Sequence, residues 1–583
     1  MVEIAPEPPE NVTSQVDEAS PGVREKGQRR FPFRIVDFLL ALLIVAVFVS
    51  QVVMWTAWDS GWGDSLKNLI TVSQFMLVLA CGLLWWVLFG PIGWKTRVLT
   101  GLAVVLGLAG WTASIHHIEP TGDMLPHIVY RWEKLAEEKL REHLATVSRP
   151  EIEALESRPV PAIMPEDMPA YRGIHRDGVV IGPELSQNWQ TSPPSELFRQ
   201  PCGKGYSAFV VVDGLLITIE QRGEQEAIVC YDSKTGEEQW IHQYDASFFE
   251  AMGGAGPRAT PVIHGDSVYS FGAFGDLCCL DLLTGTQRWH VNSLIQFDQP
   301  NNVWAMSSSP LIYEDSVIVN VGGTEGNALV AYSLAAGQIV WKGSGLPEPV
   351  QTTDFTTGTA PDKGDLNSVA GYSSPMLSMV AGQEVLLNFE GLGLRAHRPE
   401  NGEELWFHPF QNDALVNVAQ PIVINEDAGS ARIFLSASYN VGCEMLRVSR
   451  SDEGRWTVDS LWANKNMKCK FTSPVYYEGY LYGLDEGILV CLDPESGDRM
   501  WKGSRSGLRG RYRHGQILLT NGQIVALSEQ GELVLVDPSP EELKEVTWFQ
   551  VLPQGKNWNP LTLAHGIVYV RNTGEMAAYN LAR

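Results

Sequence analysis

A short pattern that returns along most of the chain limits the fold more than any other feature. Its clearest copy starts at Ala259-Thr-Pro261 and passes through two alternating segments to Asp281, a Thr284-Gly285 turn and Trp289. Asp can accept hydrogen bonds from a turn backbone, Gly adopts the left-handed conformation, and Trp fills the space between neighbouring sheets. Each copy is therefore predicted to form one antiparallel sheet.

The turn and its tryptophan recur at intervals of about 40 to 65 residues, a length that suits blades of four strands. The clear copies end at Trp240, Trp289, Trp341, Trp406 and Trp501. Degenerate copies begin near Ala419, Gly515 and Asn559 and bring the total to eight, although seven blades also fit. We therefore predict an all-β fold, an eight-bladed β-propeller of four-stranded antiparallel blades over residues 168–583. A solenoid or separate sandwiches are the alternatives.

The last copy runs from Asn559 to Arg583 and leaves no room for a fourth strand. The segment Glu196-Leu-Phe-Arg199, just before the first full copy, looks like the strand that carries the aromatic residue in other copies. We expect this segment to complete the last blade, because ring closure removes an exposed sheet edge.

Composition agrees with this fold and excludes some functions. The sequence contains 55 Gly, 34 Pro and 19 Trp, which favours a β-protein with many turns. A net charge of -25 argues against nucleic acid as a partner, because phosphate binding needs clustered Lys and Arg. The eight cysteines show no paired C-x-x-C spacing, so zinc binding through sulfur is not expected. Cys230, Cys279 and Cys491 recur at one place in the repeat, which predicts core packing.

The N-terminal part predicts a membrane anchor. Residues 1–34 are rich in Pro, Glu and Ser and predict a disordered cytoplasmic tail. Three apolar segments within residues 35–115 are candidate transmembrane helices: Ile35–Trp58, Leu69–Trp94 and Val98–Ile115. The third is short and Gly-rich, so a re-entrant or interfacial helix is an alternative, and a cleaved signal peptide is the alternative for the first.

Basic residues predict the orientation of this anchor. Arg24, Lys26, Arg29, Arg30 and Arg34 precede the first segment, and Lys95 and Arg97 separate the second from the third. Such residues concentrate on the cytoplasmic side. The loop Asp59–Asn68 carries two acids and one Lys, as an outside loop may. Three crossings then place the N-terminus in the cytoplasm and the propeller outside it, as a multi-pass protein of the inner membrane with a periplasmic or extracytoplasmic domain.

Residues 116–167 predict an amphipathic helix and a linker. Apolar residues repeat about every four positions among many charges, namely Ile128, Trp132, Leu135, Ala136, Leu140 and Leu144. Such a helix could lie on the membrane surface, or pack against the propeller or a neighbouring chain. The Pro-rich run Arg158–Pro169 predicts the linker.

With these features in hand, the chain resembles PQQ-like (pyrroloquinoline quinone) β-propeller repeat proteins of the quinoprotein alcohol dehydrogenase-like superfamily, specifically the membrane-anchored bacterial group. The motifs that carry the resemblance are Gly122-Asp-Met-Leu-Pro126 with Arg131-Trp132, Tyr171-Arg-Gly-Ile-His-Arg-Asp-Gly178, Gly256-Pro-Arg-Ala-Thr-Pro261, Arg513-His-Gly-Gln516 and Trp558-Asn-Pro560. The resemblance implies eight blades but no single function. Quinoprotein alcohol and glucose dehydrogenases hold PQQ and calcium on the propeller axis, whereas the barrel-assembly lipoprotein binds partner proteins without a cofactor.

The starts of the blades are expected to line the central channel, and they are polar. These ligand or channel-lining candidates are Tyr206, Arg258, Ser308, Tyr372, Gln420, Lys470, His514 and Asn559. Arg258, Lys470 and His514 could hold a polar or anionic ligand, or the channel could be filled with water that satisfies backbone groups. His514 is also a candidate metal ligand or general base, although a His without a visible partner is more often neither.

A PQQ-dependent enzyme would need cations for the quinone, Glu, Asn and Asp oxygens for calcium, and a carboxylate base. That set cannot be mapped on the sequence, so no catalytic, cofactor-binding or metal-ligating residue is predicted. Cys278-Cys279 resembles the vicinal disulfide beside PQQ in some dehydrogenases. The pair occupies the position of Val229-Cys230 and Val490-Cys491 in other blades, however, which favours core packing.

We therefore expect a non-catalytic binding or scaffold module for an envelope protein or a saccharide, without a cofactor and without nucleic acid. The alternative is a PQQ-dependent alcohol or sugar dehydrogenase that uses PQQ with calcium and passes electrons to membrane quinone. A hydrolase has less support, because no Gly-x-Ser-x-Gly or His-Glu-x-x-His motif occurs. His116-His117 and Asp37 lie near the predicted membrane boundaries, where hydration favours a structural role.

Overall fold

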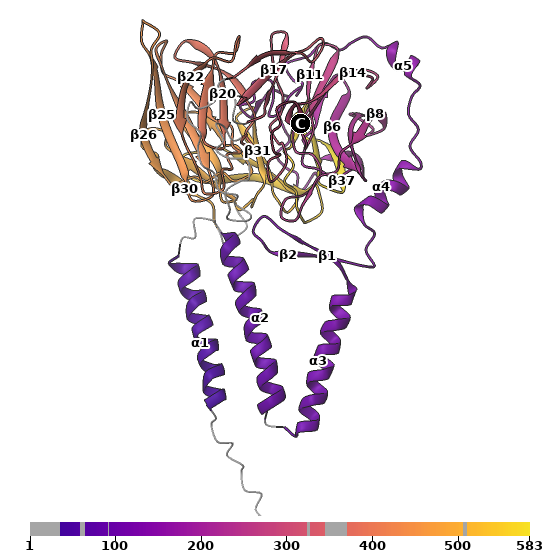
Figure 1. The fold of residues 1–583 in the computed structure, drawn as a ribbon, viewed down its shortest axis with the longest axis vertical. Coiled ribbons are helices and arrows are strands. Elements are labelled where there is room, and N and C mark those ends of the chain that lie inside the picture. Colours follow the sequence, from indigo (N-terminus) through magenta and orange to yellow (C-terminus); the bar gives the residue numbers. More distant parts are fainter. Residues whose placement is uncertain (1–34, 59–63, 91, 323–326, 344–369, 505–509) are drawn as a thin grey trace, which may run out of the picture.

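The chain folds into a β-propeller with three long helices projecting from one end (Figure 1). This computed structural model describes residues 35–58, 64–90, 92–322, 327–343, 370–504 and 510–583. The predicted tail, residues 1–34, lies outside the described residues. The predicted fold class is confirmed, with eight blades rather than seven.

The helices α1 (Ile35–Thr56), α2 (Asp64–Phe89) and α3 (Trp94–Ser114) are each long and apolar enough to cross a membrane. Figure 1 shows α1 and α3 running toward the propeller and α2 running away from it, so the turn between α2 and α3 lies at the far end. Helix α2 starts before the predicted Leu69, because residues 64–68 form its first turn, from which Ser65 and Asn68 donate to the carbonyls of Gly122 and Asp123.

Polar side chains join the first two helices within their apolar surfaces. Gln51 Nε2 donates to Gln74 Oε1 at 2.7 Å, and Trp85 Nε1 donates to Asp37 Oδ1 at 2.7 Å. In an apolar solvent such hydrogen bonds hold helices in register, since the unpaired groups would have no water to bind. The structural role expected for Asp37 agrees with this contact.

The eight blades are four-stranded antiparallel sheets that follow one another along the chain. Blade 1 consists of β5 (Val210–Val212), β6 (Leu215–Arg222), β7 (Gln225–Asp232) and β8 (Glu238–Asp245); blade 2 of β11 (Val262–His264), β12 (Ser267–Phe271), β13 (Asp276–Asp281) and β14 (Gln287–Asn292); blade 3 of β15 (Leu311–Tyr313), β16 (Ser316–Asn320), β17 (Leu329–Ser333) and β18 (Ile339–Lys342); and blade 4 of β19 (Met376–Val380), β20 (Gln383–Glu390), β21 (Gly393–His397) and β22 (Glu404–Pro409). Blade 5 consists of β23 (Ile422–Asn425), β24 (Ser430–Ala437), β25 (Gly442–Arg450) and β26 (Trp456–Asn464); blade 6 of β27 (Val475–Tyr477), β28 (Tyr480–Asp485), β29 (Ile488–Leu492) and β30 (Arg499–Lys502); blade 7 of β31 (Gln516–Thr520), β32 (Gln523–Leu527), β33 (Glu532–Asp537) and β34 (Lys544–Gln550), joined by β3 (Val179–Val180); and blade 8 of β35 (Thr562–Ala564), β36 (Ile567–Arg571), β37 (Glu575–Asn580) and β4 (Ser195–Pro201).

Contacts between neighbouring blades explain the repeated Gly and Trp. The Trp240 indole on β8 donates to the Leu282 carbonyl of the next blade at 3.0 Å and lies over Gly285 of that blade's turn. A Cβ on Gly285 would lie 2.3 Å from the Trp240 ring, and the φ angle of Gly285 is +69°. Only glycine suits a turn that combines a left-handed backbone with this contact. Trp289, Trp462 and Trp501 donate to the following blade in the same way.

The segment predicted to close the ring does so. Strand β4 pairs antiparallel with β37, with Phe198 opposite Ala578. Phe198 takes the place that Trp holds in other blades, since a Cβ on Gly236 of blade 1 would lie 2.7 Å from its ring. Blade 8 therefore combines strands from both ends of the propeller sequence, and the ring has no open edge between blades 8 and 1.

The predicted core role of the cysteines is confirmed, and all eight are free. Cys278 and Cys279 are adjacent on β13, so their side chains point to opposite faces of blade 2. Cys278 packs in the cluster shared with blade 1 and Cys279 in the cluster shared with blade 3.

The prediction of an amphipathic helix from Ile128 to Leu144 is wrong for its first half and confirmed for its second half. Ile128 lies in β2 (Pro126–Tyr130), which pairs with β1 (Ile115–Pro120), and only Ala136–Leu144 is helical, as α4. The β-branched and aromatic residues of β2 favour a strand, and their fourfold spacing with the helix is incidental. Helix α4 packs on the propeller, where Leu140 is buried and Glu137 forms a 2.6 Å ion pair with Lys204.

Four short elements complete the structure. These are α5 (Ile152–Glu156), the hairpin of β9 (Phe249–Glu250) and β10 (Gly254–Ala255), and α6 (Ser293–Gln296).

The closing strand yields a test of ring stability. We expect Phe198→Ala to lower the free energy of unfolding by about 3–5 kcal/mol, the range for a buried Phe truncated in a core. Leu197→Ala is the matched control, because Leu197 lies on the same strand and is exposed. Urea unfolding of the full chain in detergent micelles, followed by tryptophan fluorescence, measures both. Equal effects of the two substitutions would show that closure does not depend on the Phe198 contact.

Candidate functional site

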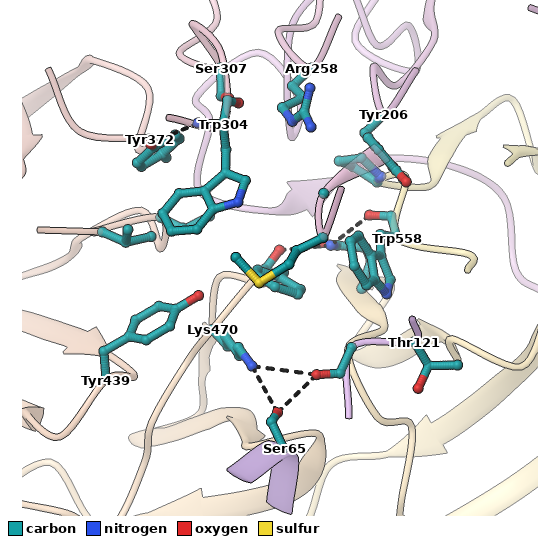
Figure 2. A pocket seen from close by; sticks show the side chains of 18 of the residues that line it. Ser65, Thr121, Tyr206, Arg258, Trp304, Ser307, Tyr372, Tyr439, Lys470 and Trp558 are labelled. Carbon is teal, nitrogen blue, oxygen red and sulfur yellow. Dashed lines mark hydrogen bonds between the residues drawn. The ribbon is translucent and has the colours of Figure 1, made fainter. Parts of the chain in front are cut away.

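A cavity of about 490 Å³ lies on the propeller axis at the end that the helices reach. Its wall combines starts of propeller blades with the first turns of α2 and the tip of the β1–β2 hairpin. Seven aromatic side chains form much of it, namely Tyr171, Tyr206, Trp304, Tyr372, Tyr439, Phe471 and Trp558. Figure 2 shows the rings of Tyr206, Trp304, Tyr372, Tyr439 and Trp558 around the cavity, with Arg258 on one side and Lys470 and Ser65 on the opposite side.

The aromatic rings support one another in pairs. The rings of Tyr206 and Trp558 stack with centroids 5.5 Å apart, and those of Trp304 and Tyr372 lie 6.0 Å apart. Burial raises the pKa of the Tyr206 and Tyr372 hydroxyls well above the ordinary value for tyrosine. Both phenols are therefore neutral at physiological pH and offer the cavity ring faces and hydroxyl groups.

Arg258 and Lys470 are the charged side chains in the cavity wall. The Arg258 guanidinium donates to the carbonyls of Gly256 (2.7 Å) and Gly254 (3.3 Å) and lies over the rings of Tyr206 and Phe248. Burial lowers its pKa, although Tyr206, Tyr372, Glu250 and Glu226 oppose that effect. The starting value is so high that arginine keeps its charge.

Lys470 holds the opposite side of the cavity. Its ammonium group lies 3.3 Å from Ser65 Oγ and 3.5 Å from the Gly122 carbonyl, and it faces the rings of Tyr439 and Phe471. One cation thus contacts α2, the hairpin tip and the propeller together (Figure 2).

The tip of the β1–β2 hairpin closes this end of the channel. Gly122 donates its N–H to Glu529 at 2.8 Å, and its carbonyl accepts from Ser65 at 3.0 Å. A Cβ on Gly122 would lie 1.9 Å from the His514 ring, so only glycine fits. The motif Gly122–Pro126, noted in the sequence, is therefore a plug for the propeller mouth.

An ion cluster holds the plug in place. The buried Asp123 carboxylate lies 3.2 Å from Arg511, 3.7 Å from Arg513 and 3.3 Å from His514 Nε2. Burial alone would raise the pKa of Asp123, but His514, Arg511 and Arg513 together hold it far below the ordinary range. The carboxylate therefore stays ionised throughout the physiological pH range.

The segment Tyr171–Gly178 closes the channel beyond the cavity. Arg176 donates to the carbonyls of Ser309 (3.1 Å), Pro310 and Pro375 (2.9 Å), and Arg172 reaches Pro474 (3.0 Å) and Ile517 (3.1 Å). Burial lowers the pKa of both guanidiniums, that of Arg176 to about 9. Their guanidinium N–H groups donate hydrogen bonds to carbonyls of four blades that face the axis. This explains why two arginines are buried in one turn.

The eight predicted channel residues divide into two groups. Tyr206, Arg258, Tyr372 and Lys470 line the cavity. Ser308 is buried between the lining residues Ser307 and Ser309. Gln420 accepts from Ser373 (2.6 Å), Asn559 donates to Gly205 (3.1 Å) and Ser207 (3.0 Å), and His514 contacts the plug, so these three brace blades or hold Asp123.

Sequence reasoning missed most of the aromatic wall. Trp304 lies in the loop between blades 2 and 3, and Tyr439 lies in the turn between β24 and β25. Ser65, Leu66 and Leu69 come from the anchor, where no pattern signals a contact with the propeller. Trp558 belongs to the motif Trp558-Asn-Pro560 noted in the sequence, and this motif could have identified it as a site residue.

The cavity wall formed by the described ranges lacks the oxygen ligands that a calcium–PQQ site needs. It contains neither Asp, Glu nor Asn among the described residues. Glu250 and Glu226 influence Arg258, but Glu250 accepts the N–H groups of Met252 and Gly253, and Glu226 accepts from Tyr244 and Ala273. Within the part of the chain that the structure describes, no three His, Cys, Asp or Glu side chains could hold a metal ion. The donor set does not fit that cofactor arrangement.

The ion cluster predicts a pH-dependent plug. Asp123→Asn should destabilise hairpin docking by roughly 2–3 kcal/mol, because Arg513 loses its buried counter-charge and Arg511 keeps only Asp64. Since the folded pKa of Asp123 is lowered, its contribution is complete above the ordinary Asp pKa of about 4 and declines as the pH falls below it. Hydrogen–deuterium exchange of residues 121–125 measures this loss of docking. The quantity compared is the ratio of the exchange rate in the variant to that in wild type, from pH 3 to 8.

Glu119→Gln, a change on the same hairpin at a half-exposed position, is the control and should leave exchange unchanged. The role of the cluster would be contradicted if Asp123→Asn and Glu119→Gln gave the same ratio of exchange to wild type. It would also be contradicted if the ratio for Asp123→Asn did not decrease once the pH is lowered past 4.

Comparisons with known proteins concern the repeat region. None of the curated proteins matches the chain. Solved structures similar to it include BamB from Moraxella catarrhalis (14% identity, 66% of this chain and 97% of that chain, TM-score 0.43) and the quinohemoprotein alcohol dehydrogenase from Comamonas testosteroni (12%, 76% and 84%, 0.48). The quinohemoprotein alcohol dehydrogenase ADHIIG from Pseudomonas putida HK5 is similar too (12%, 73% and 83%, 0.49).

A family model described as outer membrane protein assembly factor BamB matches residues 186–370 and 224–503, which together span more than half of the chain. With eight PQQ-type blades closed by β4, the chain belongs to this family of PQQ-repeat β-propellers.

Proposed function

We propose that this chain is a membrane-anchored, extracytoplasmic binding module that holds an envelope protein or a saccharide through its axial cavity and the surrounding loops, without catalysis. The observation that carries the proposal is the cavity wall of aromatic rings, hydroxyls and two cations without a carboxylate. Ring faces and a few fixed polar groups are typical of ligand pockets. Catalysis of the quinoprotein type would need metal-binding oxygens and a carboxylate base instead.

The anchor supports a place at the membrane. Three helices are long and apolar enough to span it, and the turn with Lys95 and Arg97 lies at the end away from the propeller. Because such residues favour the cytoplasmic side, the propeller belongs outside the cytoplasm in this proposal. A partner in the envelope is in keeping with the family described as an outer membrane protein assembly factor.

The alternative, a PQQ-dependent alcohol or sugar dehydrogenase, makes the opposite prediction. Calorimetric titration of the full chain in detergent micelles with PQQ should show no calcium-dependent heat, because the cavity wall contributes no carboxylate to a calcium ion. Micromolar binding that requires calcium and disappears in Arg258→Ala would overturn the binding-module proposal.

Partner capture at the loops tests the binding role itself. A photo-crosslinking residue in place of the exposed Phe249, beside the cavity loop that includes Met252, should yield a discrete adduct with an envelope protein or saccharide in intact cells. The same residue in place of Trp548, exposed on the outer strand β34 of blade 7, is the control. No adduct at Phe249, or the same products at both positions, would argue against this function.

A further inference from the structure

One wall of the cavity is the surface of a helix that is apolar enough to span a membrane. Ser65, Leu66 and Leu69 in the first turns of α2 line the cavity, and Leu69 is 48% exposed. Helix α2 continues from there to Phe89 through apolar residues. The apolar surface of α2 therefore continues into the cavity wall, where it offers an alkyl chain a contact that excludes water.

The cavity is positive within an acidic protein. The whole chain carries a net charge of -25, yet the charged residues of the wall are Arg258 and Lys470. Neither forms an ion pair with a carboxylate in the described part of the chain; their hydrogen bonds go to carbonyls and to Ser65. By contrast, Arg511 and Arg513 nearby are both matched by Asp123. Two cations that pair directly with no carboxylate of the described residues favour an anion between them in this aromatic cavity.

Apolar side chains also surround the cavity on its outer side. Lys470 precedes β27 and contacts α2, so the first strands start at the end of the propeller that the helices reach. In antiparallel blades the loops after the second and fourth strands lie at the same end. Phe249 (73% exposed) and Ile295 (81% exposed) follow fourth strands, and Phe274 follows a second strand. Such a cluster of exposed apolar loops suits the headgroup region of a bilayer.

We propose that the cavity binds a phosphate-bearing anionic lipid, with the phosphate between Lys470 and Arg258 and the upper part of an acyl chain against Leu66 and Leu69. This inference rests on the proposed binding function and names its ligand class. A soluble phosphate compound would use the two cations but not the apolar wall of α2, and a neutral lipid would use that wall but leave the cations unmatched. A cavity of about 490 Å³ holds a headgroup and the start of the chains, and the rest of the lipid remains in the bilayer.

Native mass spectrometry of the full chain tests the ligand class. The protein in neutral detergent is mixed with equal amounts of phosphatidylglycerol and phosphatidylcholine. We expect preferential retention of phosphatidylglycerol, and we expect Lys470→Gln and Arg258→Gln each to lower that retention about tenfold, the effect of one lost charge-assisted contact. Lys470→Arg keeps the charge and should restore it. Arg455→Gln removes an exposed cation on blade 5 and is the matched control.

Further measurements distinguish a lipid phosphate from a soluble phosphate and control for misfolding of the variants. Glycerol phosphate at millimolar concentration should not displace the lipid; displacement would assign the cations to a soluble phosphate and overturn the lipid proposal. Equal retention of both lipids, or unchanged retention in Lys470→Gln with thermal melting as in wild type, would also overturn it. If Lys470→Gln or Arg258→Gln melts at a lower temperature than wild type, the test is whether Lys470→Arg retains phosphatidylglycerol as wild type does. If lipid selectivity is absent but the crosslinked adduct at Phe249 still forms, only the lipid proposal is rejected. If both lipid selectivity and the adduct are absent, the proposed binding function is rejected as well.

Discussion

The pairing of β4 with β37 is the constraint on which the rest of the structure depends. The last repeat supplies three strands of its blade, so the ring closes only when a segment from before the first repeat returns to complete it. Phe198 then contacts Gly236 as Trp240, Trp289, Trp341 and Trp462 contact a Gly of the next blade. Closure makes the contacts between neighbouring blades continuous around the ring and gives the last blade its fourth strand.

The same constraint brings the segments around the propeller axis into place. Because the chain must reach β4 from the anchor, residues between α3 and β4 pass both ends of the channel. The hairpin tip with Gly122 closes one end, and the turn with Arg172 and Arg176 closes the other. Both plugs satisfy groups that the blades leave unpaired at the axis, since inner strands have no neighbour there. The cavity is the space that remains between them.

This arrangement explains why a shared fold does not carry a shared function. PQQ-type blades determine the ring, and the residues at the axis decide what the ring holds. In this chain the axis presents aromatic rings and two cations, while the carboxylates nearby accept hydrogen bonds from backbone, tyrosine or arginine. The anchor adds a feature that a soluble propeller lacks, an apolar helix in the cavity wall.

The sequence by itself determined the blades, the closing strand and the apolar helices, because each rests on local rules: alternation, turn residues and hydrophobic length. It also predicted Arg258 and Lys470 at blade starts, for the same periodic reason. Tertiary structure alone decided that β2 pairs with β1 instead of extending α4, that Asp123 meets Arg511, and that Leu66 faces Lys470 across one cavity. The last two of these join residues hundreds of positions apart, and no periodicity in a sequence records which segments become neighbours when a ring closes.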